Sequence, residues 1–116
     1  MGMMSRRKGC RGEREAAAEL RRLFGVEAYR GRQYHGGPDS PDVRAAIPGI
    51  HIEVKRAESL RLYTALHQAI ADAGDRVAMV LHRANRQPWV VILRLEDLPR
   101  LAEQIYLTLR QTSSGS

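Results

Sequence analysis

The chain has 116 residues, which is enough for one domain with a single core and too few for a second globular unit. Lys and Arg total 19 against 13 Asp and Glu, and the net charge of +6 favours a polyanionic partner, nucleic acid first, over an acidic one. No run approaches the roughly 18 apolar residues of a membrane span, and the single cysteine, Cys10, excludes an intramolecular disulfide. We therefore expect a reducing, cytoplasmic setting and no membrane partner.

The first third of the chain predicts a helix, a short strand and a loop. Apolar residues recur at helical spacing within residues 12–24, and Gly25 is placed to end that helix. Residues 26–31 predict a short strand. The glycine- and proline-rich segment 32–41 then predicts an irregular loop.

Two antiparallel strands are predicted next. Residues 42–46 and 50–56 alternate apolar and polar residues around Pro48-Gly49, the signature of a tight turn. With that turn, Arg44 lies opposite Glu53. Because side chains alternate along a strand, one polar face carries Asp42, Arg44, Glu53 and Lys55. The opposite face points into the core and carries Val43, Ala45, Ile52 and Val54.

The second half predicts a helix, two strands and a final helix. Residues 62–73 form an amphipathic pattern that closes at Gly74, and the apolar segments 77–82 and 89–93 predict strands. Pro99 fits the first turn of the last helix.

The element order α-β-β-β-α-β-β-α indicates an α/β domain whose central mixed five-stranded sheet is flanked by helices. Residues 1–110 make a single domain, and the polar segment 111–116 predicts a disordered tail. The last helix is amphipathic, so with strand 89–93 it either contributes to a dimer interface or only caps the core.

The predicted polar face favours a metal site. Asp42 and Glu53 are diagonal neighbours with Cα atoms about 7–8 Å apart, so their carboxylates can converge on one ion. An all-oxygen ligand set suits Mg²⁺, with Mn²⁺ as a substitute, whereas zinc prefers histidine or cysteine. Lys55 adds a positive charge that can stabilise developing negative charge or activate a water. A Glu-x-Lys pair on a strand can instead be a solvated surface pair.

Glu13 is a further acid on the apolar stripe of the first helix. It either completes the metal shell or is a first-turn residue that the helix dipole favours. Glu15 and Glu19 are placed to pair with Arg22 and neighbouring arginines on the helix surface.

Four spaced blocks give the chain a resemblance to a known family. They are Arg7-Lys8-Gly9-Cys10-Arg11-Gly12-Glu13-Arg14-Glu15, the segment 25–30, Pro41-Asp42-Val43, and Ile52-Glu53-Val54-Lys55, with the strand 77–81 following in order. In these blocks the chain resembles the PD-(D/E)xK nuclease superfamily and, more closely, the archaeal-type Holliday junction resolvases, which viruses and phages also carry. The segment 31–41 departs from the family, which has a Ser/Gly-rich loop there.

The resemblance implies a restriction-endonuclease-like core and a metal-dependent endonuclease that acts on branched DNA as a homodimer. It implies that Glu13, Asp42 and Glu53 bind the metal and that Lys55 is the catalytic lysine. A serine role in the loop would fall to Ser40, and Gln68 is either an accessory residue or simply solvated. The expected DNA contacts are Arg7, Lys8, Arg11, Arg14, Arg30, Arg32 and Arg56. If the protein is viral, its setting is the host cytoplasm.

Several alternatives stay open at this stage. Another nuclease of the same superfamily would act on flaps or ordinary duplex, and a non-catalytic nucleic-acid-binding module would keep the basic surface without cutting. His51 shares the parity of Glu53 and could approach a phosphate, although a histidine near the end of a hairpin is more often exposed.

Overall fold

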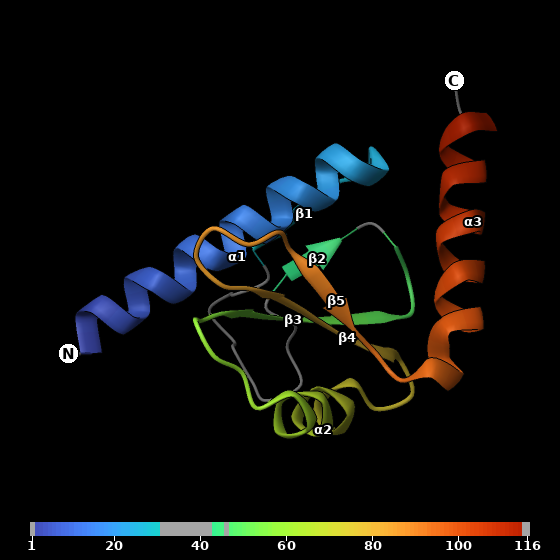
Figure 1. The fold of residues 1–116 in the computed structure, drawn as a ribbon. Coiled ribbons are helices and arrows are strands. Elements are labelled where there is room, and N and C mark those ends of the chain that lie inside the picture. Colours follow the sequence, from blue (N-terminus) through green and yellow to red (C-terminus); the bar gives the residue numbers. More distant parts are fainter. Residues whose placement is uncertain (1, 31–42, 46, 115–116) are drawn as a thin grey trace.

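The computed structural model describes residues 2–30, 43–45 and 47–114 (Figure 1). In chain order the elements are α1 (Gly2–Phe24), β1 (Ala28–Arg30), β2 (Val43–Ala45), β3 (Ile50–Arg56), α2 (Leu62–Ala73), β4 (Val77–Arg83), β5 (Val90–Ile92), the 3₁₀ turn η1 (Leu95–Asp97) and α3 (Leu98–Ser114). The α/β class expected from the sequence is confirmed.

The first and last helices are longer than expected. Helix α1 begins at Gly2, because the Met- and Arg-rich segment before residue 12 has good helix propensity and extends the amphipathic part. Helix α3 continues to Ser114, so the disordered tail predicted from residue 111 is wrong for the first four of its residues. Once a helix is nucleated, each added residue gains a backbone hydrogen bond, and a polar composition does not end it.

The strands form a mixed sheet in the order β1-β2-β3-β4-β5. β1, β2 and β3 pair antiparallel, β3 and β4 pair parallel through the crossover helix α2, and β5 is antiparallel to β4. The long parallel pair β3–β4 is the centre of the sheet, and the flanking strands have three residues each.

The register predicted for β2 and β3 is wrong. It placed Val43 opposite Val54, but the structure pairs Val43 with Ile52. Ile47 is buried in the core and is not paired in either strand, so the connection is longer than the two-residue turn assumed from Pro48-Gly49. The register differs from the predicted one by an even number of residues, so the predicted alternation of core and polar positions along β3 is retained.

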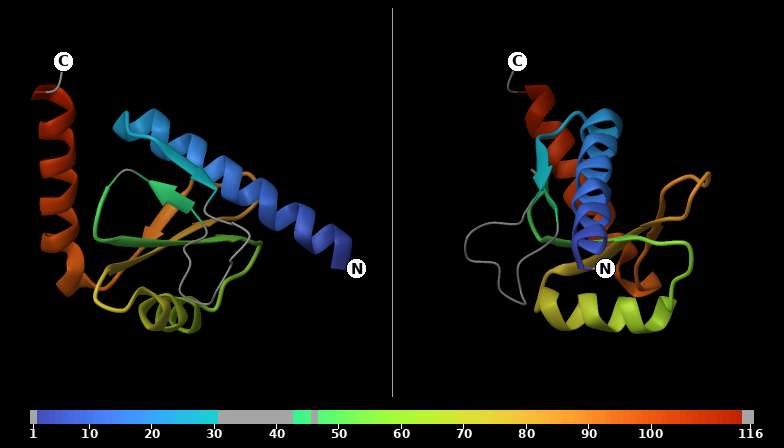
Figure 2. Two further views of the ribbon diagram at one scale, coloured as in Figure 1. Left: turned by 180° about the vertical axis from the view of Figure 1, so that it is seen from behind. Right: turned by 90° about the vertical axis from the view of Figure 1, so that its left-hand side faces the viewer.

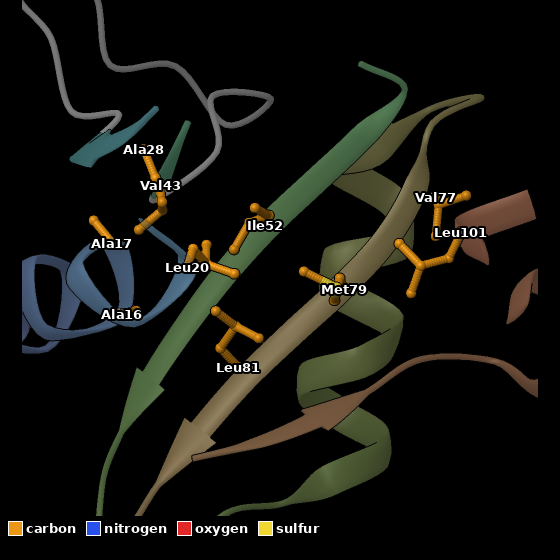
Figure 3. Packing of buried hydrophobic residues seen from close by; sticks show 10 residues of the cluster. All are labelled: Ala16, Ala17, Leu20, Ala28, Val43, Ile52, Val77, Met79, Leu81 and Leu101. Atoms are coloured by element: carbon orange, nitrogen blue, oxygen red, sulfur yellow. The ribbon is translucent and has the colours of Figure 1, made fainter. Parts of the chain in front are cut away.

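Helices cover opposite faces of the sheet (Figures 1 and 2). Helix α1 and the first turns of α3 pack on the face that carries Ile52, Met79 and Leu81 (Figure 3). Helix α2 packs on the other face, where Ala69 meets Val80. The even-numbered side chains of β3 therefore face α1, and the odd-numbered ones face α2.

Gly12 lets α1 lie directly on β3. A Cβ atom at this position would be 2.6 Å from Cβ of Arg56 and 3.7 Å from the Val54 side chain. Only glycine therefore fits this approach without a displacement of the helix.

Candidate metal centre

Three polar side chains follow one another on the face of β3 that points toward α2. They are His51, Glu53 and Lys55, and they alternate with Ile52 and Val54, which contact the core on the α1 side. The predicted separation of Glu53 and Lys55 from their apolar neighbours is confirmed. A cluster of functional groups thus lies between the centre of the sheet and α2.

His51 is fully buried, contrary to the expectation that it is exposed. Its Nε2 lies 2.7 Å from Oε1 of Glu53, whose side chain is 12% exposed. Its other ring nitrogen, Nδ1, is buried and has no hydrogen-bond partner among the residues that the structure describes. The parallel pairing of β3 with β4 puts this position in the middle of the sheet and under α2, which explains the burial.

Helix α2 supplies a second carboxylate. One ligand atom from each of His51, Glu53 and Asp72 lies within 4.8 Å of the others, so the three residues could hold a metal ion. Gln68, one helical turn before Asp72, donates from Nε2 to both carboxylate oxygens at 3.2 and 3.3 Å. Gln68 is exposed, but it is also a direct neighbour of the candidate centre.

Sequence reasoning missed His51 and Asp72 as members of this group. One signal for Asp72 is available afterwards: it lies in the last turn of α2, where the helix dipole disfavours an acid. It also lies three residues after Ala69, on the side of α2 that packs against the sheet. The helix dipole therefore does not account for an acid at this position.

The other predicted ligands are placed differently. Glu13 is half-buried on α1, the helix that covers the opposite face of the sheet, and the group of three that could hold a metal does not include it. Asp42 and Ser40 lie outside the described residues. Lys55 is half-buried two residues after Glu53 on the same face of β3.

The expected DNA contacts fall into three groups. Arg11 and Arg14 are exposed on α1, and the backbone of α1 also includes Arg7 and Lys8. Arg30 is the last residue of β1, and Arg32 lies outside the described residues.

Arg56 is used within the fold. Its side chain is 14% exposed and donates to Asn85 Oδ1 at 2.9 Å and to the Arg83 carbonyl at 3.2 Å. Its Nε also lies 3.4 Å from Oε2 of Glu15. Glu15 is therefore on the side of α1 that faces the sheet, and it does not pair with Arg22 as expected. The predicted pair of Glu19 with Arg22 is confirmed at 2.7 Å, and the hydrogen bond from Arg22 lowers the pKa of Glu19.

Comparisons of the chain with protein-family models, curated proteins and solved structures found no match. Among the described residues, no helix combines the length and the apolar character that crossing a membrane requires. The function of the centre is therefore inferred from its own residues and their geometry.

Proposed function

We propose that the protein is a metal-dependent DNA endonuclease of the PD-(D/E)xK type. The observation that carries this proposal is the position of Glu53 and Lys55 on one face of β3, with Glu53 inside a group that could hold a divalent ion. A metal held there would orient a phosphodiester and activate a water, and Lys55 would stabilise the charge that develops on the phosphate. Attack of the water on phosphorus breaks the bond to the 3′ oxygen and leaves a 5′-phosphate and a 3′-hydroxyl.

The element order supports a restriction-endonuclease-like core. An antiparallel meander of β1, β2 and β3 is followed by the crossover helix α2 and the parallel strand β4. In this proposal Glu53 is the metal ligand common to the family pattern and to the described geometry. The resemblance also implies Glu13 and Asp42 as ligands and Mg²⁺ or Mn²⁺ as the ion, although α1, which carries Glu13, covers the face of β3 opposite Glu53.

The basic surface supports DNA as the substrate. A net charge of +6 attracts a phosphate backbone, and α1 presents the exposed Arg11 and Arg14. A helix of 23 residues is about 35 Å long, a length that spans several phosphates of one duplex arm. Such contacts position DNA without reading its sequence, which suits an enzyme that recognises a branched shape.

We further propose that two copies resolve a four-way junction as a symmetric homodimer in the cytoplasm, or in the host cytoplasm if the protein is viral. The described residues of one chain form one candidate centre. A junction that is resolved by two opposed nicks needs two such centres related by symmetry. Exposed apolar side chains on α3 and β5 support an interface there. Tyr106 is 62% exposed and Val91 is 51% exposed.

The test compares a four-way junction with a linear duplex of the same sequence, each incubated with the protein and Mg²⁺ or Mn²⁺. We expect paired nicks in the junction and at least about 100-fold slower cutting by Glu53→Gln and Lys55→Gln. Glu96→Gln, which changes an exposed acid on η1, is the matched control and should cut normally. Equal cutting of both substrates would remove the resolvase assignment, and binding without cutting at any metal concentration would indicate a non-catalytic module.

A further inference from the structure

We infer that His51, Glu53 and Asp72 form a mixed nitrogen–oxygen site that selects a first-row transition ion, Zn²⁺ foremost, over Mg²⁺ and Ca²⁺. This preference differs from the Mg²⁺ or Mn²⁺ that the family resemblance implies, and the inference rests on the proposed function only for the role of the ion in cutting. The ligand set differs from the all-oxygen set expected from the sequence, because the structure brings a buried imidazole to Glu53.

The spacing of the three residues suits a small ion. Ligand atoms about 2.0–2.2 Å from one zinc ion are roughly 3–4 Å apart from each other. One ligand atom each of His51, Glu53 and Asp72 lies within 4.8 Å of the others, and Nε2 of His51 is 2.7 Å from Oε1 of Glu53. Only small side-chain movements are needed to place all three around one ion, which would replace the proton between the imidazole and the carboxylate.

The full burial of His51, whose Nε2 faces Glu53, is the second observation that bears on a ligand. A buried polar atom without a partner is costly, and Nδ1 of His51 has none within the described part of the chain. The hydrogen bond to Glu53 uses only one ring nitrogen of a side chain that is 0% exposed. An ion bound at Nε2 would replace the one hydrogen bond that this buried imidazole makes to Glu53 by a stronger interaction, and it would leave Nδ1 as it is.

The surroundings of Asp72 also favour a cation. Asp72 lies in the last turn of α2, where the partial negative charge of the helix end adds to that of the carboxylate. Gln68 orients the carboxylate from the preceding turn, as outer-shell groups do around metal ligands. Arg76 donates to the backbone carbonyls of residues 72 and 73 at the end of the same helix.

The chemistry of this ligand set decides the class of ion. Mg²⁺ and Ca²⁺ prefer oxygen ligands, whereas imidazole suits zinc and its neighbours in the first transition row. Three protein ligands that leave a further position for water are the arrangement of catalytic zinc sites. One imidazole and two carboxylates therefore predict a transition-ion site that remains open to water or to a phosphate oxygen.

The experiment titrates the metal-free full chain with Zn²⁺, Mg²⁺ or Ca²⁺ alone by calorimetry, without DNA. We expect one Zn²⁺ per chain, with an affinity at least about tenfold above that for Mg²⁺. His51→Gln should remove this preference, Asp72→Asn should abolish tight zinc binding, and Gln68→Ala should weaken it by about 10–100-fold. His67→Gln and Asp75→Asn, which change exposed residues on or just after α2, are matched controls and should bind zinc normally.

Equal affinities for Zn²⁺ and Mg²⁺, or unchanged zinc binding by His51→Gln, would overturn the inference. If His51→Gln does not fold, electron spin echo spectroscopy of the Mn²⁺-loaded wild-type chain decides. Coupling to an imidazole nitrogen is expected, and its absence would overturn the inference.

The same measurements separate the inference from the proposed function. Zinc binding through His51 without DNA cutting would refute the nuclease and leave the metal site standing. Mg²⁺-dependent cutting that needs Glu13 and is indifferent to His51 and Asp72 would refute the metal site and leave the nuclease standing.

Discussion

The imidazole of His51 lies 2.7 Å from the carboxylate of Glu53, and the two side chains come from the same face of the central strand β3. His51 is fully buried, so this contact fixes one carboxylate oxygen from the protein interior. Glu53 also lies in one group with Asp72 of α2, and Lys55 follows it on the same face of the strand. Glu53 is thus the residue on which both the proposed function and the proposed metal preference depend.

The close approach of α1 to β3 predicts that Gly12→Ala destabilises the protein. The added Cβ would lie 2.6 Å from Cβ of Arg56, so the helix must move from the sheet. We expect a loss of about 1–3 kcal/mol in the free energy of unfolding, measured with urea. Ala18→Ser, at an exposed position of the same helix, is the control and should have little effect. A Gly12→Ala protein as stable as the wild type would show that the helix does not lie this close to the strand.

Arg14 and Arg56 are predicted to differ in their effect on DNA binding. Arg14 is exposed on α1, so Arg14→Ala should weaken binding and reduce the slope of log affinity against log salt by about 0.9, the value for one phosphate. Arg56 donates to Asn85 and to the Arg83 carbonyl, so Arg56→Ala should lower the melting temperature and leave the salt dependence unchanged. Fluorescence anisotropy over a range of salt concentrations checks both, and the reverse pattern would assign the DNA contact to Arg56.

The pair of Glu19 with Arg22 predicts a small effect of acid. The hydrogen bond from Arg22 lowers the pKa of Glu19 below its ordinary value of 4.5. As the pH falls, Glu19 is therefore protonated at a higher pH in the unfolded chain than in the folded one. The contribution to stability is therefore present above that ordinary value and is lost as the pH falls through the lower folded pKa. In Arg22→Gln, carboxyl chemical shifts should show the pKa of Glu19 moving back up. An unchanged titration of Glu19 would mean that the pair does not persist in solution.

The exposed apolar side chains of α3 predict a variant that does not dimerise. If Tyr106 lies in the proposed interface, Tyr106→Glu places a charge there and should give a monomer by analytical ultracentrifugation. Glu103→Gln, at an exposed position one turn earlier, should leave the dimer intact. A wild-type chain that is monomeric at all concentrations would contradict the homodimer itself.

The local sequence pattern was sufficient to predict part of the candidate site. The alternation of Glu53 and Lys55 with Ile52 and Val54 follows from the pleat of a strand and the burial of its apolar face, and it survives a change in register. The α/β class follows in the same way from the order of helical and strand patterns.

Two residues of the candidate centre could not be predicted, because their roles depend on contacts between distant segments. His51 is buried only because β4 pairs beside it and α2 packs over it. Asp72 reaches β3 only through the crossover from strand to helix. The register error has a related cause, since Ile47 joins the core and lengthens a connection that the dipeptide Pro48-Gly49 suggested was tight.

The crossover that separates Glu53 from Asp72 has a consequence for how the chain acquires its ion. Asp72 joins His51 and Glu53 only when α2 has docked on the sheet. An unfolded or partly folded chain therefore lacks the three-residue metal site. Metal affinity then measures the docking equilibrium of α2, and amide exchange in this helix should slow when the ion is added. In the proposed enzyme, the metal would therefore bind, and catalysis would begin, only after α2 has packed on the sheet.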